Sequence, residues 1–292
     1  ERFKYLMNVI GLGRAGCAIA DCFSKFPQYE VYKFDHDIAK DKNSFNIPKQ
    51  KSHEEYEKKF PNLKKRLQKI SGDVIFILCG AGNISGCALR LLEQLSDVSV
   101  SVLYIQPDLT MLSETEATQE RIVSNVFQEY ARSGMFDRLY LASNSEIEKC
   151  VGDVPIISYY ETINQAIVNT LHMVTVFKYS EPILGTFTEP HEIARIATVG
   201  ILDIEENEEK WFFDLQMPRD VVYYYGINED DLRSDGTLFK KIKDYVQDKV
   251  EDKMNVSYGV YQTNYDQKYC YCIKYSSVVQ SYINELDDQD IG

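Results

Sequence analysis

The stretch DVIFILCGAGNISGCALRLLEQL, residues 73–95, places a glycine-rich turn between an apolar strand and an amphipathic helix. A similar turn occurs earlier, in NVIGLGRAGCAIADCF at residues 8–23. Glycines in such turns allow backbone amides to approach a phosphate, and the N-terminus of the following helix stabilises the phosphate charge. One turn of this kind is typical of a dinucleotide-binding domain. Two turns that face one crevice favour a ligand with a longer phosphate chain, such as a nucleoside triphosphate.

The composition predicts a globular chain with a substantial core. The chain has 292 residues, of which 44% are hydrophobic, enough for one large or two modest domains. No run approaches the roughly 20 apolar residues that a membrane span needs. The 45 acidic and 32 basic residues give a net charge of -13, which disfavours nucleic acid and anionic membranes as partners. The seven cysteines lack the CxxC pairs of a zinc site and the four histidines form no recognisable ligand set, so we expect reduced thiols, a cytoplasmic location and no metal bound by side chains.

The first half of the chain alternates apolar strands with amphipathic helices. Such alternation predicts an α/β fold, in which a Rossmann-like parallel sheet is covered by helices on both faces. The strands are expected at residues 5–11, 29–35, 73–79, 98–106 and 138–143, and the helices at 15–26, 53–70, 86–96 and 114–132.

A long helix is expected next, over residues 159–179, and its apolar positions cover most of its circumference. Such a helix must be buried on several sides, as a helix running between two domains would be. The remaining pattern predicts a smaller α+β domain. It contains a helix passing into a strand over 192–204, a strand at 220–227, a helix at 238–252, and a β-hairpin of 255–263 and 268–279 joined across NYDQ. We therefore expect a nucleotide-binding domain at 1–180 that includes a central helix at 160–179, a second domain at 181–283, and an acidic tail at 284–292.

The second turn, GAGNISG at residues 80–86, resembles the GGGTG[ST]G signature of the tubulin/FtsZ family. The run GLGRAGCAIA resembles the first phosphate loop of that family, and the order of elements is similar over nearly the whole chain. The resemblance implies a protein that binds GTP or GDP, uses Mg²⁺ where hydrolysis is retained, and assembles head to tail with copies of itself into filaments. The divergence of the motifs favours a phage, plasmid or otherwise lineage-restricted member.

The resemblance also implies a pocket for the base and ribose. In LYLASNSEIEKC, Asn144 stands where the family presents an Asn to the nucleotide, and in ISYYETINQAI the family stacks an aromatic residue on the base, here Tyr160. Asn164 would bind the edge of the base from the same helical face, because it lies four residues later. Glu114 is the matching acid for the ribose. The nucleotide-binding residues so implied are Gly11, Gly13, Arg14, Gly16, Cys17, Gly80, Ala81, Gly82, Asn83, Ile84, Ser85, Gly86, Glu114, Asn144, Tyr160 and Asn164.

The catalytic residues implied by the resemblance lie in GTFTEPHEIARI, residues 185–196. The family hydrolyses its nucleotide when a loop after the central helix, with an NxDxxD-like pattern, enters the pocket of the neighbouring subunit. Glu189 and Glu192 fall where the two acids are expected, and Phe187 replaces the Asn. Carboxylates there could orient the attacking water. Alternatively, the two glutamates could complement the dipole at the start of a helix.

The sequence departs from the family pattern in two places. The glycine-rich loop for the γ-phosphate is absent, and DKNSFNIPKQKSHEEYEKKF stands in its place. Within the signature, Ala81, Asn83 and Ile84 replace Gly, Thr and Gly, so side chains stand where backbone would approach phosphate. Two other readings therefore remain open. One is a non-polymerising relative that has lost nucleotide turnover or even binding and acts as a regulator or an interaction module. The other is an NAD-dependent oxidoreductase in which Asp35 binds the adenosine ribose.

Overall fold

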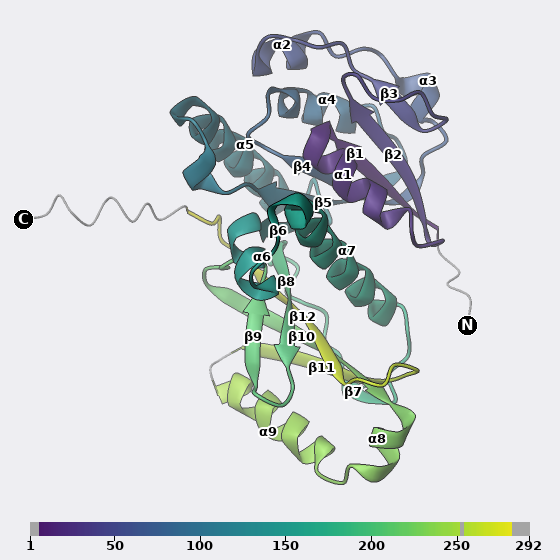
Figure 1. The fold of residues 1–292 in the computed structure, drawn as a ribbon, viewed down its shortest axis with the longest axis vertical. Coiled ribbons are helices and arrows are strands. Elements are labelled where there is room, and N and C mark those ends of the chain that lie inside the picture. The colour runs from purple at the N-terminus through teal and green to yellow at the C-terminus, as the bar shows by residue number, and fades with distance from the viewer. Residues whose placement is uncertain (1–5, 252–253, 282–292) are drawn as a thin grey trace, which may run out of the picture.

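The computed structural model describes residues 6–251 and 254–281, and its first half follows the predicted alternation (Figure 1). The helices begin where the strands end, with a few short 3-10 turns (η) between them. The elements are β1 Met7–Leu12, α1 Gly13–Phe23, β2 Tyr29–Asp35, β3 Ser44–Asn46, α2 His53–Lys58, α3 Lys64–Leu67, β4 Gly72–Cys79, η1 Asn83–Cys87, α4 Ala88–Leu92, β5 Val98–Gln106, η2 Leu109–Met111, α5 Glu114–Arg132, β6 Arg138–Ser143, α6 Asn144–Val151, η3 Ile156–Ser158 and α7 Tyr159–Lys178.

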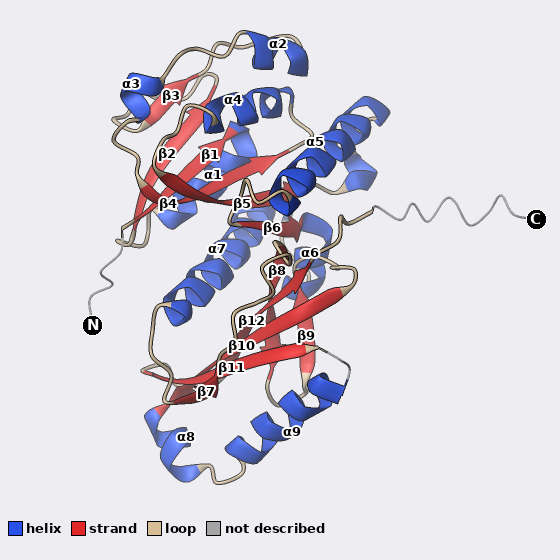
Figure 2. Cartoon of the chain, turned by 180° about the vertical axis from the view of Figure 1, so that it is seen from behind, coloured by secondary structure: helices blue, strands red, loops and turns tan. Residues whose placement is uncertain are grey.

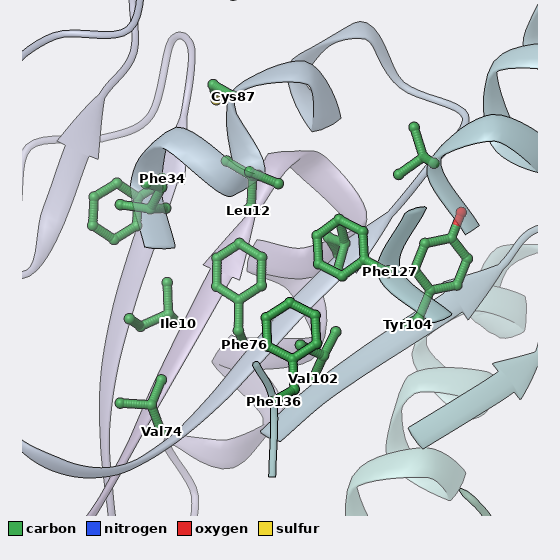
Figure 3. Packing of buried hydrophobic residues seen from close by; sticks show 14 of the residues in the cluster. Ile10, Leu12, Phe34, Val74, Phe76, Cys87, Val102, Tyr104, Phe127 and Phe136 are labelled. Carbon is green, nitrogen blue, oxygen red and sulfur yellow. The ribbon is translucent and has the colours of Figure 1, made fainter. Parts of the chain in front are cut away.

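Six strands of this half form a parallel sheet in the order β3-β2-β1-β4-β5-β6. Because successive side chains of a strand point to opposite faces, each strand supplies both layers of the core. Ile10, Phe76 and Val102 pack with Phe127 of α5 on one face, as Figure 3 shows. Helices α1 and α7 cover the other face. The predicted α/β fold with a helix-covered parallel sheet is therefore confirmed.

Helix α7 is the predicted central helix, and it crosses the middle of the molecule in both views (Figures 1 and 2). Its residues Ile163, Ile167 and Leu171 are buried against the parallel sheet. Near its end, the ring of Phe177 packs on Tyr261, with ring centroids 4.6 Å apart. Helix α7 contacts both halves of the chain, which explains why apolar residues cover most of its circumference.

The second half adds mostly antiparallel strands to the same sheet. Its elements are β7 Leu184–Thr186, β8 Ile196–Asp203, β9 Glu208–Trp211, β10 Pro218–Asn228, α8 Glu229–Ser234, α9 Leu238–Glu251, β11 Asn255–Thr263 and β12 Tyr269–Ser276. Strand β8 pairs in parallel with β6, and the order continues as β8-β12-β10-β11-β7, with β9 at the side of β8. The proposed second domain therefore shares a continuous sheet with the first, while residues 282–292, including the predicted tail, lie outside the described residues.

The predicted β-hairpin of 255–263 and 268–279 is wrong. Strand β10 lies between β11 and β12, parallel to the first and antiparallel to the second. The physical reason is burial: β10 is buried along most of its length, so it takes an inner position and pairs along both edges. Helix α9 supplies the crossover that two parallel strands require.

The helix expected to begin at residue 192 is also absent. The chain turns there, with the Ala194 amide donating to the His191 carbonyl at 2.8 Å, and strand β8 begins at Ile196. The helix expected over 53–70 is two short helices, α2 and α3, separated by a break that contains Pro61. Proline removes a backbone donor and clashes with the preceding turn, which explains the break.

Candidate functional site

The candidate site lies at one edge of the parallel sheet. Strands β1, β4, β5 and β6 run in the same direction, so their carboxyl ends meet at the same edge. These strands end at Leu12, Cys79, Gln106 and Ser143. Open α/β sheets bind ligands in the crevice outside these ends. Both glycine turns and Asn144 therefore belong to one edge, as the sequence predicts.

The first turn presents backbone donors toward that edge. Gly13 has a φ of 72°, in the left-handed region that favours glycine, and it begins α1. No side chain caps this helix, so the amides of its first turn are not used by a cap. Arg14 is exposed beside them and forms no ion pair with any residue that the structure describes. The turn therefore offers amide donors and one cation to an anion.

At the other glycines of the two turns, except Gly82, close packing within the chain explains why no side chain fits. A Cβ on Gly11 would collide with the carbonyl oxygen of Gly16, and a Cβ on Gly16 would lie 2.5 Å from the Ile77 oxygen. Likewise, a Cβ on Gly80 would meet the Tyr104 hydroxyl. The structure requires these glycines for the close approach of α1 and the second turn to the sheet, and their contact with phosphate stays a prediction.

The second turn is held in place by hydrogen bonds that its carbonyl groups accept. Ser85 Oγ donates to the Gly80 carbonyl at 3.0 Å, and Gln119 of α5 donates to the Ala81 carbonyl at 2.9 Å. Gly82 is different, since no heavy atom lies within 4 Å of where its Cβ would stand. At Gly13 and Gly82, unlike the other glycines of the two turns, an added Cβ would meet neither backbone nor the side chain of a strand residue.

Ile84 lies between the two turns. Its Cγ2 is 2.7 Å from the position that a Cβ on Gly13 would take, and its side chain is only 9% exposed. The family signature has glycine at this position. The space between the turns is therefore narrowed by a methyl group, although the open face of Gly82 and the uncapped amides of α1 still fit a phosphate chain.

Gln106 is a candidate that the sequence analysis missed. It ends β5 at the same edge, it is 8% exposed, and its Nε2 has no hydrogen-bond partner among the described residues. A buried amide group normally finds a partner, so an unpaired one at a binding edge points to a ligand or water. The available signal was a single polar residue closing the apolar run VSVSVLYIQ.

The residues expected around the base come from two neighbouring helices. Asn144 begins α6, while Tyr160 and Asn164 lie in the first two turns of α7. The two helices are joined by Tyr159, whose hydroxyl donates to Glu148 Oε2 at 2.9 Å and whose ring meets that of Tyr160 edge-on. Tyr160 is 69% exposed, so it is not a core residue.

Glu114 begins α5 and lines a hollow of about 440 Å³ on the α5 side of the second turn. His53 and Glu54 of α2 line its other wall, and the backbone of His53 packs on Gly86. Burial lowers the pKa of His53. Glu114 therefore lies by α2 and the second turn, and its role toward a ribose stays a prediction.

Glu189 and Glu192 lie at the opposite edge of the sheet. They precede β8, whose first residue, Ile196, pairs with Leu139 near the start of β6. Strand β6 has six residues, so this edge is about 20 Å from the carboxyl ends. Both glutamates are exposed, and no helix follows Glu192, which removes the interpretation that they complement a helix dipole. Within one subunit they cannot reach the two turns.

No protein-family model and no curated protein matches the sequence significantly. Solved structures do match the fold. The GTPγS-form protofilament of TubZ from Bacillus thuringiensis serovar israelensis has a TM-score of 0.71 at 15% identity, covering 94% of this chain and 87% of that one. The GTPγS-bound protofilament of CetZ2 from Haloferax volcanii has a TM-score of 0.67 at 16% identity, covering 94% of each chain. The empty FtsZ dimer from M. jannaschii has a TM-score of 0.65 at 11% identity, covering 94% and 88%.

The chain therefore has the tubulin/FtsZ fold. Two further properties of the described residues bear on the site. No group of three or more His, Cys, Asp or Glu side chains among them could hold a metal ion. In the same residues, no helix combines the length and apolar character needed to cross a membrane.

Proposed function

We propose that this protein binds a guanine nucleotide, GTP or GDP, at the carboxyl edge of its parallel sheet and assembles head to tail with copies of itself. The observation that carries the proposal is the separation of two groups of residues. The glycine turns lie at one edge, and the loop with Glu189 and Glu192 lies at the other, about one strand length away. Stacking one subunit on the next in the same orientation brings the two edges together.

The residues at the carboxyl edge fit a nucleotide. The uncapped first turn of α1, with Gly13 and Arg14, and the open face of Gly82 would hold the phosphates. Tyr160 and Asn164 would hold the base. Mg²⁺ bound with the nucleotide would offset the phosphate charge. In this proposal Glu189 and Glu192 of one subunit orient water toward the nucleotide of the next, so hydrolysis requires assembly.

Apolar side chains are exposed at both ends of the proposed stack. Ile156 and Ile157, just before α7, are 94% and 101% exposed at the nucleotide end. At the opposite end, Phe187 is 44% exposed and Ile193 is 59% exposed. Exposed apolar patches mark interaction surfaces, and two different patches at opposite ends give a head-to-tail contact that repeats without closing. This supports a filament rather than a closed dimer.

The fold relatives support the same proposal, since the TubZ and CetZ2 structures are protofilaments in GTPγS forms. The NAD-dependent alternative is not favoured. The carboxylate of Asp35 accepts the backbone N–H of His36 at 2.8 Å, so part of its capacity toward a ribose is already used. We further propose a cytoplasmic filament and retain the division at residues 180 and 283 as a hypothesis about its domains.

The test uses the purified full chain. Bound nucleotide is released by denaturation and identified by mass spectrometry, and assembly and turnover are followed by light scattering and phosphate release after GTP addition. We expect a guanine nucleotide and a GTP-dependent rise in scattering above a critical concentration. Recovery of NAD(H), or the absence of both scattering and phosphate release at high protein concentration, would refute the proposal.

A further inference from the structure

The loop between β7 and β8 carries a histidine that is held by a buried carboxylate. His191 Nδ1 lies 2.9 and 3.0 Å from the two carboxylate oxygens of Asp220. Asn255 Nδ2 donates to the same carboxylate at 2.6 Å. The side chain of Asp220 is 2% exposed, whereas that of His191 is 48% exposed. One nitrogen of the imidazole is therefore held by a buried carboxylate, while about half of the side chain remains exposed.

The backbone of β10 explains why Asp220 points at this loop. Opposite β12, Pro218 pairs with Ser276 and Asp220 pairs with Tyr275, so β10 has one extra residue, Arg219. Such a β-bulge re-aims the side chain that follows it. The buried carboxylate then depends on its donors, because a charge removed from water needs hydrogen bonds to offset its desolvation.

The loop is also held in place near its start, three residues before His191. The Thr188 amide donates to Ser257 Oγ at 2.9 Å, and the two hydroxyl oxygens lie 3.0 Å apart. Phe187 packs against Gly259 of β11, where a Cβ would lie 2.5 Å from its ring. The position of His191 is therefore set by its own bond to Asp220 of β10 and by the contacts that Phe187 and Thr188 make with β11.

The two glutamates of the loop have no comparable support. Glu192 contacts Arg195 at 3.6 Å with 90% of its side chain exposed, and an ion pair this exposed contributes little to order. Glu189 is exposed as well. Among the exposed ionisable side chains of this loop, Glu189, His191 and Glu192, it is His191 that is held by a buried partner, and preorganised groups are those that act best on a reacting atom.

We propose that His191 is the residue that accepts the proton of the attacking water at the junction between subunits, an inference that rests on the proposed function. A carboxylate accepts hydrogen bonds only, so Nδ1 is the nitrogen that carries a proton toward Asp220, and Nε2 is the nitrogen whose lone pair accepts a proton in the neutral ring. Water oxygen forms a bond to the γ-phosphorus as the bond from that phosphorus to the β-phosphate oxygen breaks. GDP leaves with the electron pair, Nε2 takes the water proton, and the imidazolium, stabilised by Asp220, later returns this proton to solvent. Asp220 is a positioning residue.

The test compares the wild-type full chain with His191→Ala and His191→Asn, each with and without free imidazole. GTP affinity, the critical concentration for assembly and phosphate release per assembled subunit are measured separately. General-base catalysis contributes typically about 10²-fold or more. We expect phosphate release to fall by that amount in both variants while affinity and critical concentration change less than about twofold. Imidazole should restore part of the rate in His191→Ala and not in His191→Asn, where a side chain fills the space.

Each other outcome overturns the inference. If the wild type assembles and hydrolyses GTP and His191→Ala keeps its rate within a few-fold, His191 is not the base, although the proposed function stands. If both variants lose assembly, His191 is a structural anchor of the loop. If the wild type neither binds GTP nor releases phosphate, the proposed function fails, and the inference fails with it.

Discussion

Replacing Gly82 with Ala tests whether the second turn faces a ligand. The backbone at Gly82 has φ and ψ of -81° and 140°, which alanine adopts without strain, and no heavy atom lies within 4 Å of the new methyl group. The substitution should therefore not weaken the folded state. Because alanine restricts the unfolded chain, we expect the free energy of unfolding to rise by about 0.4–1 kcal/mol.

The effect of Gly82→Ala on nucleotide binding should be opposite. A methyl group on the open face of the turn takes the space through which a phosphate would approach the backbone. We expect GTP affinity to fall by about tenfold, equivalent to about 1.4 kcal/mol. Urea unfolding gives the stability change, and titration with a fluorescent GTP analogue gives the affinity. A variant that is more stable yet binds more weakly can be explained only by contact with the ligand.

Gly86→Ala is the matched control, four residues along the same turn. Its Cβ would collide with the backbone oxygen of His53, which cannot rotate away. We expect a loss of stability of about 1–3 kcal/mol, as in other overpacked sites. The reasoning about the turn is refuted if Gly82→Ala leaves the GTP affinity of a GTP-binding wild type unchanged, or if it destabilises the fold as much as Gly86→Ala does.

Three further experiments probe the site and the core. Ile84→Gly should cost about 2–5 kcal/mol of stability, because a buried side chain is removed, and should tighten GTP binding by opening the space beside Gly13; calorimetry and titration separate the two. The pair Tyr160→Ala and Asn164→Ala should weaken GTP binding by roughly 1–3 kcal/mol with little change in melting temperature, and unchanged affinity would refute the base pocket. Burial lowers the pKa of His172 to about 4, so stability is fully present above its unfolded pKa of about 6.5 and is lost as pH falls toward 4, by up to about 3 kcal/mol. Urea unfolding at about pH 7 and pH 4.5 should show a smaller loss in His172→Leu.

The sequence was most informative where local pattern and tertiary pairing agree. Strands and helices alternate up to Ser143, and parallel strands joined by helices leave few other arrangements. The hairpin prediction failed because it used only the short connection between two strands rich in Tyr and Val. The strand, helix and strand over 218–263 were the better signal, since that order is typical of a parallel pair with a crossover.

The candidate site was harder to predict because its contacts are distant in sequence. The collision that requires a glycine at residue 80 comes from Tyr104, and the one at residue 86 comes from His53. Counting glycines in a motif cannot reveal such partners. The bond that holds His191 could not be predicted either, since its carboxylate partner lies 29 positions away, on a strand whose bulge has no clear mark in the sequence.

Strand β12 has a consequence for how the subunit is made. It separates β8 from β10 in the sheet, and after it Gln280 docks on α5, where its amide donates to Gln128 Oε1 at 2.7 Å. During synthesis, strands β10, β11 and β7 therefore stay unjoined to β8 and the parallel strands until residues 269–276 have been made. The loop from β7 to β8 spans this gap, so its two ends reach their final relative positions once β12 has paired with both β8 and β10. In the proposed filament, the subunit end that carries Glu189 and Glu192 is therefore complete only after β12 has been made.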